Sequence, residues 1–297
     1  MFSRKAYRWT IVILSLIVLA EGLCIVLMKN AQPEAFPAGG YEKEILDKYP
    51  YAMENGDISV YLQPIIEPYG ETVCGAEALS RWYDGEEYIS PGDFIPVLED
   101  SGDIRDYDEF VFRTVCSYQA ELMDGGAEPF PVSVNLSALS AQEDGAAEKY
   151  RTIMEEYNLS PGCISIEITE SVELDPAELE RIAGEFRSEG FTLEMDDFGA
   201  GYANFAVLSF VPYDILKLDK SLSDGTGSDR GEIILSETIE MGKRLGMYII
   251  AEGVETQEQV IYLKGAGCDA IQGYYYSKPL PWEEFKAYLK ERKPAEQ

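Results

Sequence analysis

Eight short runs of β-branched and aromatic residues between residues 58 and 275 constrain the fold more than any other feature of this sequence. They read ISVYLQPI, TVCGAEAL, FPVSVNL, CISIEIT, FTLEMD, YDILKLD, MYIIAE and DAIQGYY. Amphipathic stretches such as YDEFVFRTVCSYQAELM and GEIILSETIEMGKRL lie between most of them, with apolar residues at helical spacing. Eight strands with interleaved helices predict an α/β fold, a (β/α)8 TIM-type barrel whose active-site residues lie at the carboxyl ends of the strands.

One connection departs from that pattern. The segment EPYGE, residues 67–71, joins the first two predicted strands and is too short for the helical crossover that parallel neighbours need. These two strands are therefore predicted to form an antiparallel hairpin. The expected fold is a modified barrel with one antiparallel strand.

The amino-terminal segment has a different composition. Residues 1–8 form a basic flank, and residues 9–28, WTIVILSLIVLAEGLCIVLM, are a run long enough to cross a bilayer as a helix, interrupted only by Glu21. We expect a single transmembrane anchor; a cleaved signal peptide with Ala20 near the cleavage site is the alternative. Residues 29–40 are a linker rich in proline, glycine and alanine, and residues 41–297 form the barrel domain.

Charge and composition limit the ligands and the catalytic mechanisms that this chain can use. The formal net charge is −30, from 54 acidic and 24 basic residues, which opposes binding to a nucleic acid polymer. The absence of histidine excludes Ser-His-Asp and Cys-His catalysis and histidine-ligated zinc. The five cysteines lack metal-site or disulfide spacing and are expected to be small buried residues. Any catalysis by this chain must therefore use carboxylates, amides, lysine and hard metal ions.

Seven predicted strands carry polar residues at or near their carboxyl ends. These are Glu77, Asn135, Glu167, Asp196, Asp197, Lys217, Asp219, Glu252 and Gln272. A single carboxylate at a strand end is more often a solvated loop start or a helix cap. Several on one rim would repel one another unless a cation neutralised them, and oxygen ligands suit Mg²⁺ or Mn²⁺. The set predicts a site for two metal ions.

The pleat of a strand sharpens some of these assignments. Residues two apart share a face, so Glu77, Leu79 and Arg81 are expected to point the same way, with Arg81 placed to clamp a phosphate or stack on a base. Asp196 and Asp197 are neighbours, which face opposite sides of a regular strand. Both can serve one metal pair only if the strand ends there, where GAGYA follows.

Lys217 and Asp219 also share a face. They form either an ion pair with each other or a site in which the lysine lies beside a reacting phosphate or water. Glu252 closes a strand and suits a metal ligand or a general base. Glu255 begins the next helix, where its negative charge stabilises the positive end of the helix dipole.

Seven motifs, in this order, resemble those of the EAL-domain cyclic di-GMP phosphodiesterases of bacteria: EALSRW, VSVNLS, IEITES, DDFGAGYANF, ILKLDKS, IIAEGVET and IQGYYYSKPL. The resemblance covers roughly residues 41–290. It implies a modified (β/α)8 barrel with one antiparallel strand. It also implies metal-dependent hydrolysis of one phosphodiester of cyclic di-GMP, giving linear pGpG, and a homodimer.

The resemblance further assigns roles to single residues. The implied ligands of two Mg²⁺ or Mn²⁺ ions are Glu77, Asn135, Glu167, Asp196 and Asp197. Glu252 matches the family's general base, Lys217 the lysine that contacts the attacking water, and Glu170 the glutamate that positions the loop after the double aspartate. The substrate side is assigned Gln63, Leu79, Arg81, Asp219 and Gln272.

One loop departs from the family pattern. DDFGTGYSSL is the usual form, and this chain has Ala200, Ala203, Asn204 and Phe205 at the four differing positions. Because the implied metal ligands are intact, we expect an active phosphodiesterase. The alternatives are an inactive EAL module that acts as a cyclic di-GMP receptor and, from another class, an exported glycosidase with a carboxylate pair.

The location of the barrel is a point of conflict. Arg4, Lys5 and Arg8 precede the apolar run and Lys29 alone follows it closely, which favours a barrel outside the cell. A cytoplasmic second messenger requires the opposite. Giving the seven motifs more weight, we expect a single-pass protein of the bacterial inner membrane with a cytoplasmic barrel.

Overall fold

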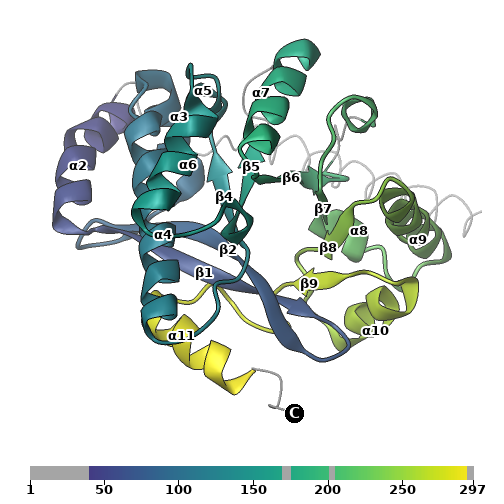
Figure 1. Ribbon diagram of the computed structural model, residues 1–297. Coiled ribbons are helices and arrows are strands. Elements are labelled where there is room, and N and C mark those ends of the chain that lie inside the picture. Colours follow the sequence, from purple (N-terminus) through teal and green to yellow (C-terminus); the bar gives the residue numbers. More distant parts are fainter. Residues whose placement is uncertain (1–39, 169–174, 201–204, 293–297) are drawn as a thin grey trace, which may run out of the picture. The chain divides into compact units, whose positions relative to one another are not determined.

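The computed structural model describes residues 40–168, 175–200 and 205–292 (Figure 1). The chain divides into two units, residues 1–49 and 50–297, and the barrel lies within the second. The predicted basic flank, the anchor at 9–28 and nearly all of the linker lie outside the described residues. No helix in the described part of the chain is both long and apolar enough to cross a membrane.

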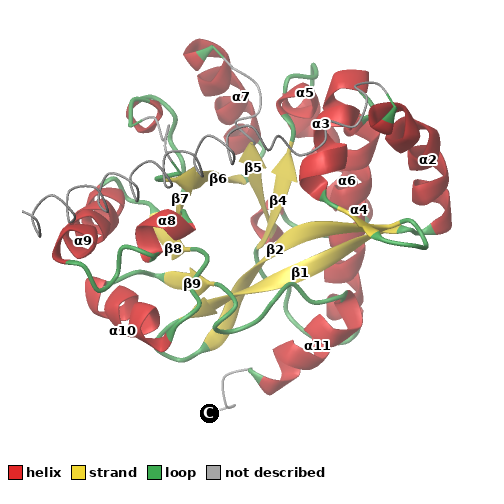
Figure 2. Ribbon diagram, turned by 180° about the vertical axis from the view of Figure 1, so that it is seen from behind, coloured by secondary structure: helices red, strands yellow, loops and turns green. Residues whose placement is uncertain are grey.

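The described strands form one closed barrel with an extra edge strand (Figure 2). Their bounds are β1 Ile58–Glu67, β2 Thr72–Tyr83, β3 Tyr88–Ile89, β4 Val132–Leu136, β5 Ile164–Ile168, β6 Thr192–Phe198, β7 Ile215–Leu218, β8 Tyr248–Ala251 and β9 Ala270–Gln272. The order is β1-β9-β8-β7-β6-β5-β4-β2-β3, and an additional β1–β2 pairing closes the ring. All eight predicted strands are present, and only the two-residue β3 was not expected.

The antiparallel strand is β1. It pairs antiparallel with β2 on one side and with β9 on the other, whereas every pair from β2–β4 around to β8–β9 is parallel. The carboxylate of Glu67 closes the tight β1–β2 connection by accepting hydrogen bonds from the backbone N–H groups of Tyr69 (2.8 Å) and Gly70. The predicted hairpin is confirmed.

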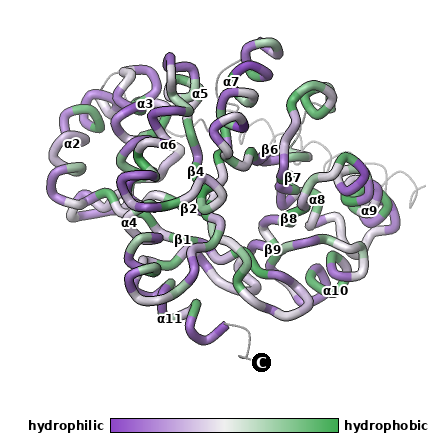
Figure 3. The backbone as a smooth tube through the Cα atoms, in the orientation of Figure 1, coloured by the Kyte–Doolittle hydropathy of each residue, from purple (hydrophilic) through white to green (hydrophobic). Residues whose placement is uncertain are grey.

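Helices lie outside the ring of strands (Figures 1 and 2). Within the second unit their bounds are α3 Pro91–Ser101, α4 Ile104–Asp124, α5 Ala138–Ala141, α6 Ala146–Glu156, α7 Pro176–Ser188, α8 Lys220–Ser223, α9 Asp229–Arg244, α10 Gln257–Ala266 and α11 Trp282–Glu291. Helix α2, Tyr41–Asn55, crosses the boundary between the two units. Hydrophobic and hydrophilic residues alternate along the helices at short intervals (Figure 3), as their amphipathic sequences predict.

The main core lies between the strands and the surrounding helices. One cluster joins Leu216 of β7 and Ile249 of β8 to Leu235 and Ile239 of α9, all of them completely buried. Helix α9 approaches β8 closely at Gly242, where an added Cβ would lie 2.5 Å from Cδ1 of Ile249. Burial of each such aliphatic side chain stabilises the fold by about 1.5–3 kcal/mol. This apolar layer holds the strands that carry the candidate site.

Candidate active site

A buried lysine stands at the centre of the polar residues at the carboxyl ends of the strands. Lys217 of β7 has no solvent exposure, and its Nζ lies 2.8 Å from Glu167, 2.8 Å from Glu252, 3.0 Å from Asp196 and 3.7 Å from Glu77. These four carboxylates come from or directly follow the strands β5, β8, β6 and β2. Closure of the barrel thus brings together residues up to 175 positions apart along the chain, from Glu77 to Glu252.

The electrostatics of this group follow from its burial. Burial alone would lower the pKa of the Lys217 ammonium, but the surrounding carboxylates outweigh that effect and raise it well above its usual value. Burial raises the pKa of Glu167 well above the usual range and that of Glu252 to about 8, although Lys217 opposes both shifts. For Asp196 burial acts in the same direction, yet the lysine and hydrogen bonds lower its pKa. Lys217 is therefore a fixed positive charge.

Asp196 and Asp197 reach the same site by a route that the sequence analysis did not foresee. Strand β6 does not end at the pair but continues to Phe198, and its register with β7 shifts between Met195 and Phe198. At this bulge Asp197 has a φ of 51°, a left-handed conformation that aspartate tolerates better than most residues. The expectation that the strand must stop was wrong, because the bulge turns both neighbours toward one side.

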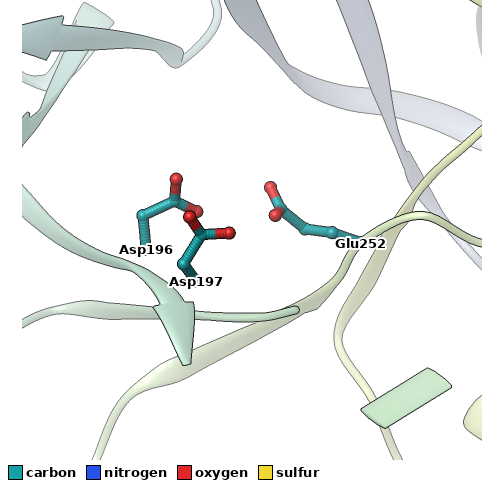
Figure 4. A group of neighbouring side chains, drawn as sticks. All are labelled: Asp196, Asp197 and Glu252. Carbon is teal, nitrogen blue, oxygen red and sulfur yellow. The ribbon is translucent and has the colours of Figure 1, made fainter. Parts of the chain in front are cut away.

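Three carboxylates are close enough to share a cation. Ligand oxygens of Asp196, Asp197 and Glu252 lie within 4.8 Å of one another (Figure 4). Asn135 lies opposite Glu167 in the parallel β4–β5 pair, and Glu167 shares Lys217 with Asp196 and Glu252. The donors are all oxygen atoms, and in the described part of the chain Lys217 is the single basic side chain paired with the carboxylates. This donor set fits hard divalent cations such as Mg²⁺ or Mn²⁺.

Two of the predicted substrate-side residues, Gln63 of β1 and Gln272 of β9, join the site through hydrogen bonds. Nε2 of Gln272 donates hydrogen bonds to a carboxylate oxygen of Glu77 and to Oε1 of Gln63 (3.2 Å). Gln63 also faces Glu77 in the hairpin register, and its Nε2 donates to the carbonyl oxygen of Ser277 (3.2 Å). Because β1 lies between β2 and β9, the hairpin completes this side of the site.

A cavity of about 430 Å³ opens beside these residues. Among its lining are Gln63, Glu77, Leu79, Asp219, Glu252 and Gln272, all of them predicted site residues. Arg81 is not part of that lining as far as the structure is described; it lies over the ring of Tyr61, 5.7 Å from its centroid, and donates a hydrogen bond to its neighbour's carbonyl, Ser80. The register of β2 with β1 is regular through these positions, so Arg81 keeps the face of Glu77 and Leu79 but lies beyond the cavity lining.

Lys217 and Asp219 do not form the ion pair that was one of the two expectations. Asp219 instead caps α8, where its Oδ1 accepts a hydrogen bond from the backbone N–H of Ser221 (2.9 Å). Glu255 pairs with Lys220, and both side chains line the cavity. Lys220 was not singled out from the sequence.

Several predicted positions fall outside the described residues. Glu170 is one of them, as are Ala203 and Asn204 of the altered loop. Within the described part of that loop, Ala200 donates its backbone N–H to the carbonyl of Asp197 (3.0 Å), and Phe205 packs edge-on against Phe198 at 5.0 Å.

Glu194 is a buried acid that the sequence analysis missed. It is 2% exposed, its Oε1 accepts a hydrogen bond from Oγ of Ser133 (2.8 Å), and burial raises its pKa. The signal was available, because Glu194 precedes Asp196 by two residues and therefore shares its face of β6. A charged residue in the middle of FTLEMD was a sign that this face is polar for more than one layer.

Comparisons with known proteins place this chain and its fold in a family. The EAL domain profile matches residues 46–279. The bifunctional diguanylate cyclase/cyclic di-GMP phosphodiesterase MucR of Pseudomonas aeruginosa is 32% identical over 248 residues, which cover 82% of this chain and 36% of MucR. The probable cyclic di-GMP phosphodiesterase PdeB of Escherichia coli is 33% identical over 236 residues, covering 79% of this chain and 45% of PdeB. The chain thus spans less than half the length of these two relatives.

Solved structures of EAL proteins also match this chain. The MucR phosphodiesterase in complex with c-di-GMP superposes with a TM-score of 0.74 at 30% identity, covering 82% of this chain and 99% of that one. An EAL domain protein from Listeria monocytogenes has a TM-score of 0.73 at 29% identity, covering 83% and 98%. With its closed barrel, its antiparallel β1 and this profile match, the chain belongs to the EAL domain family.

Proposed function

We propose that this chain hydrolyses one phosphodiester bond of cyclic di-GMP and releases linear pGpG. The observation that carries the proposal is the buried lysine surrounded by four carboxylates at the carboxyl ends of the barrel strands. Membership of a family whose relatives are named cyclic di-GMP phosphodiesterases supports the choice of substrate.

Two Mg²⁺ or Mn²⁺ ions would be held by Glu77, Asn135, Glu167, Asp196 and Asp197. When bound, such ions supply Lewis acidity at the phosphate and a water-derived nucleophile at neutral pH. The chain itself supplies the acidic oxygens and keeps them in place through the strands that carry them. Lys217 balances part of their charge and opposes the rise in pKa that burial causes for Glu167 and Glu252.

The remaining roles follow from position. Glu252 lies against Lys217 at 2.8 Å and lines the cavity, so it is placed to accept the proton of the attacking water. Lys217 is a fixed cation behind the carboxylates, and its charge would stabilise the negative charge that develops on a phosphate bound in front of them. Gln63, Leu79, Asp219 and Gln272 line the cavity and bind the rest of the dinucleotide. Arg81 lies further along β2 and would meet only a part of the ligand that extends beyond the cavity lining.

The test is an assay of the purified full chain in detergent with cyclic di-GMP and Mn²⁺, followed by separation of the products. We expect pGpG to form with Mn²⁺ and not in excess chelator. A Glu252→Gln variant keeps the side-chain shape and is expected to bind cyclic di-GMP without turnover. If the wild-type chain binds the dinucleotide tightly and forms no pGpG, hydrolysis is not its function.

That outcome would favour the second candidate, a non-catalytic cyclic di-GMP receptor. The altered loop supports this candidate, because Ala200 and Phe205 replace the threonine and leucine that the family pattern carries in the segment that follows Asp196 and Asp197. Restoring the family loop in one variant separates the two functions: a silent chain that gains turnover identifies the loop as the cause. The exported glycosidase is not carried forward, since the chain belongs to the EAL family.

We also propose a location and an assembly. The barrel is cytoplasmic, as its substrate requires, and residues 9–28 anchor it in the inner membrane. Reporter fusions at the carboxyl terminus test this; an extracellular signal would overturn the location. A homodimer is proposed from the family resemblance, and light scattering of the purified chain tests it.

A further inference from the structure

Helix α4 carries a buried carboxylate that the proposed reaction does not use. Asp108 is 4% exposed, and no basic side chain pairs with it among the residues that the structure describes. Burial raises its pKa to about 6, although hydrogen bonds from Ser137 and Ser140 oppose the shift. A carboxylate buried without a cation costs stability, so its presence calls for a role other than packing.

Within the described residues, the hydrogen bonds that Asp108 accepts come from one turn. Its Oδ2 accepts hydrogen bonds from the backbone N–H of Ser137 (3.0 Å) and from Oγ of Ser140 (2.7 Å). Ser137 is the N-cap of α5, and its Oγ accepts from the backbone N–H of Ser140 (3.1 Å). One carboxylate oxygen therefore fastens the turn between β4 and α5.

That turn begins directly behind a proposed metal ligand. Strand β4 ends at Leu136, so Ser137 is only two residues beyond Asn135. Asn135 in turn lies opposite Glu167 on β5. Only Leu136 separates Ser137 from Asn135, and the peptide units between them are planar, so few soft dihedral angles are available to absorb a shift of Ser137 before it reaches Asn135.

We propose that Asp108 is a positioning residue that holds Asn135 in place for a divalent cation, acting through the backbone N–H of Ser137. This inference rests on the metal site of the proposed function. Groups that orient metal ligands typically change metal affinity about 10–100-fold when they are removed. Asp108 would do so from a helix outside the barrel, without contacting the cation.

The same helix offers a matched control. Gln119 is 1% exposed; its Nε2 donates to the carbonyl oxygens of Cys163 (3.3 Å) and Phe130, and its Oε1 accepts from the backbone N–H of Phe130 (3.4 Å). Phe130 and Cys163 precede β4 and β5, at the end of the barrel opposite the site. Helix α4 thus bonds to the chain at both ends of β4, and only the Asp108 end lies next to a proposed ligand.

The experiment measures Mn²⁺ binding to the full chain from the electron paramagnetic resonance signal of free Mn²⁺. We expect Asp108→Ala to weaken binding about 10-fold. Asp108→Asn keeps an acceptor oxygen and is expected to weaken it by less than about 3-fold. Gln119→Ala lowers the urea midpoint but leaves Mn²⁺ affinity unchanged. Equal affinities for wild type and Asp108→Ala, or equal losses in Asp108→Ala and Gln119→Ala, would overturn the inference.

A double-mutant cycle isolates the route. If Asp108 acts through Asn135, Asp108→Ala causes no further loss of Mn²⁺ affinity in an Asn135→Ala background. A full additional loss overturns the proposed route.

If Asp108→Ala fails to fold, a second variant takes its place. Ser140→Ala removes one of the two hydrogen bonds to Asp108 and is expected to weaken Mn²⁺ binding in the same direction. An unchanged affinity would count against the inference. A wild-type chain that binds Mn²⁺ without hydrolysing cyclic di-GMP refutes only the proposed function, because these readouts do not depend on turnover.

Discussion

The two faces of strand β7 are built on opposite principles. Leu216 points outward into an apolar layer against α9, whereas the next residue, Lys217, points inward among four carboxylates. Both side chains are completely buried. The outer face gains stability from packing, while the inner face places charges where burial penalises them. Apolar packing between the strands and the outer helices stabilises the barrel. This stability offsets the cost of burying Lys217 and its four carboxylates, whose arrangement suits catalysis rather than stability.

The largest expected effect comes from removing the central charge. Lys217→Met keeps the apolar stem but leaves Glu167 and Glu252 without their shared cation. We expect hydrolysis to fall by about 10³-fold, the range for losing a preorganised charge in an active site. The measurement is kcat of folded protein with Mn²⁺. Lys243→Met, on the exposed side of α9, is the control and should leave kcat unchanged; a comparable loss there would show that the effect is not local.

Disruption of the outer face of β7 should lower stability and leave catalysis unchanged. Leu216→Ala leaves a cavity in the apolar layer and is expected to lower the free energy of unfolding by about 3 kcal/mol. Urea denaturation measures the loss, and kcat and KM of the folded fraction should stay near their wild-type values. A drop in kcat as large as that of Lys217→Met would mean that the two faces are not independent.

The pH dependence of stability tests the buried acid on α4. The pKa of Asp108 rises from 3.8 in the unfolded chain to about 6 in the fold, so the neutral form is favoured by folding. Its contribution is fully present below the unfolded pKa and is lost as the pH rises through 6. That loss amounts to about 3 kcal/mol, roughly half of it between pH 5 and pH 7.

The measurement is urea unfolding of wild type and Asp108→Asn at several pH values between 5 and 7.5. The stability of the variant relative to wild type should increase with pH across this range. Asp106→Asn, on the exposed side of the same helix, should run parallel to wild type. Parallel curves for Asp108→Asn would show that burial does not perturb this carboxyl.

Metal should stabilise the inner face by an amount that depends on its concentration. At about 100 times the dissociation constant, Mn²⁺ bound only to the folded chain adds about 2.7 kcal/mol. A thermal melt with and without chelator reveals this shift. Asp196→Asn removes a proposed ligand and should reduce the shift, whereas Leu216→Ala should retain it. A shift that survives in Asp196→Asn would place the cation elsewhere.

Much of the site could be predicted from the sequence because strand ends and pleats are local properties. Glu77, Glu167, Glu252 and Gln272 were chosen by their place at the end of a predicted strand, and all four gather around the cavity or Lys217. The prediction failed where the backbone departs from regular geometry. The bulge at Asp197 depends on how β6 and β7 pair, which no short pattern contains.

The choice of partner for Lys217 shows the same division. From the sequence, Asp219 was as plausible a partner as any, since it lies two residues away on the same face. In the fold Asp219 caps α8, and Lys217 pairs with acids from β2, β5, β6 and the end of β8. Local spacing limits which residues can face each other, but the capping of a helix and the closing of a ring decide which of them do.

By itself the sequence determined the eight strands, the antiparallel hairpin and the residue types at the rim, because periodicity, turn length and composition act over a few residues. Only the tertiary structure decided that Gln63, Glu77 and Gln272 form one hydrogen-bonded group, that both aspartates face the site, and that Lys217 sits among four acids. These contacts join distant segments. They exist because β1 closes the ring between β2 and β9, and that closure results from long-range strand pairing.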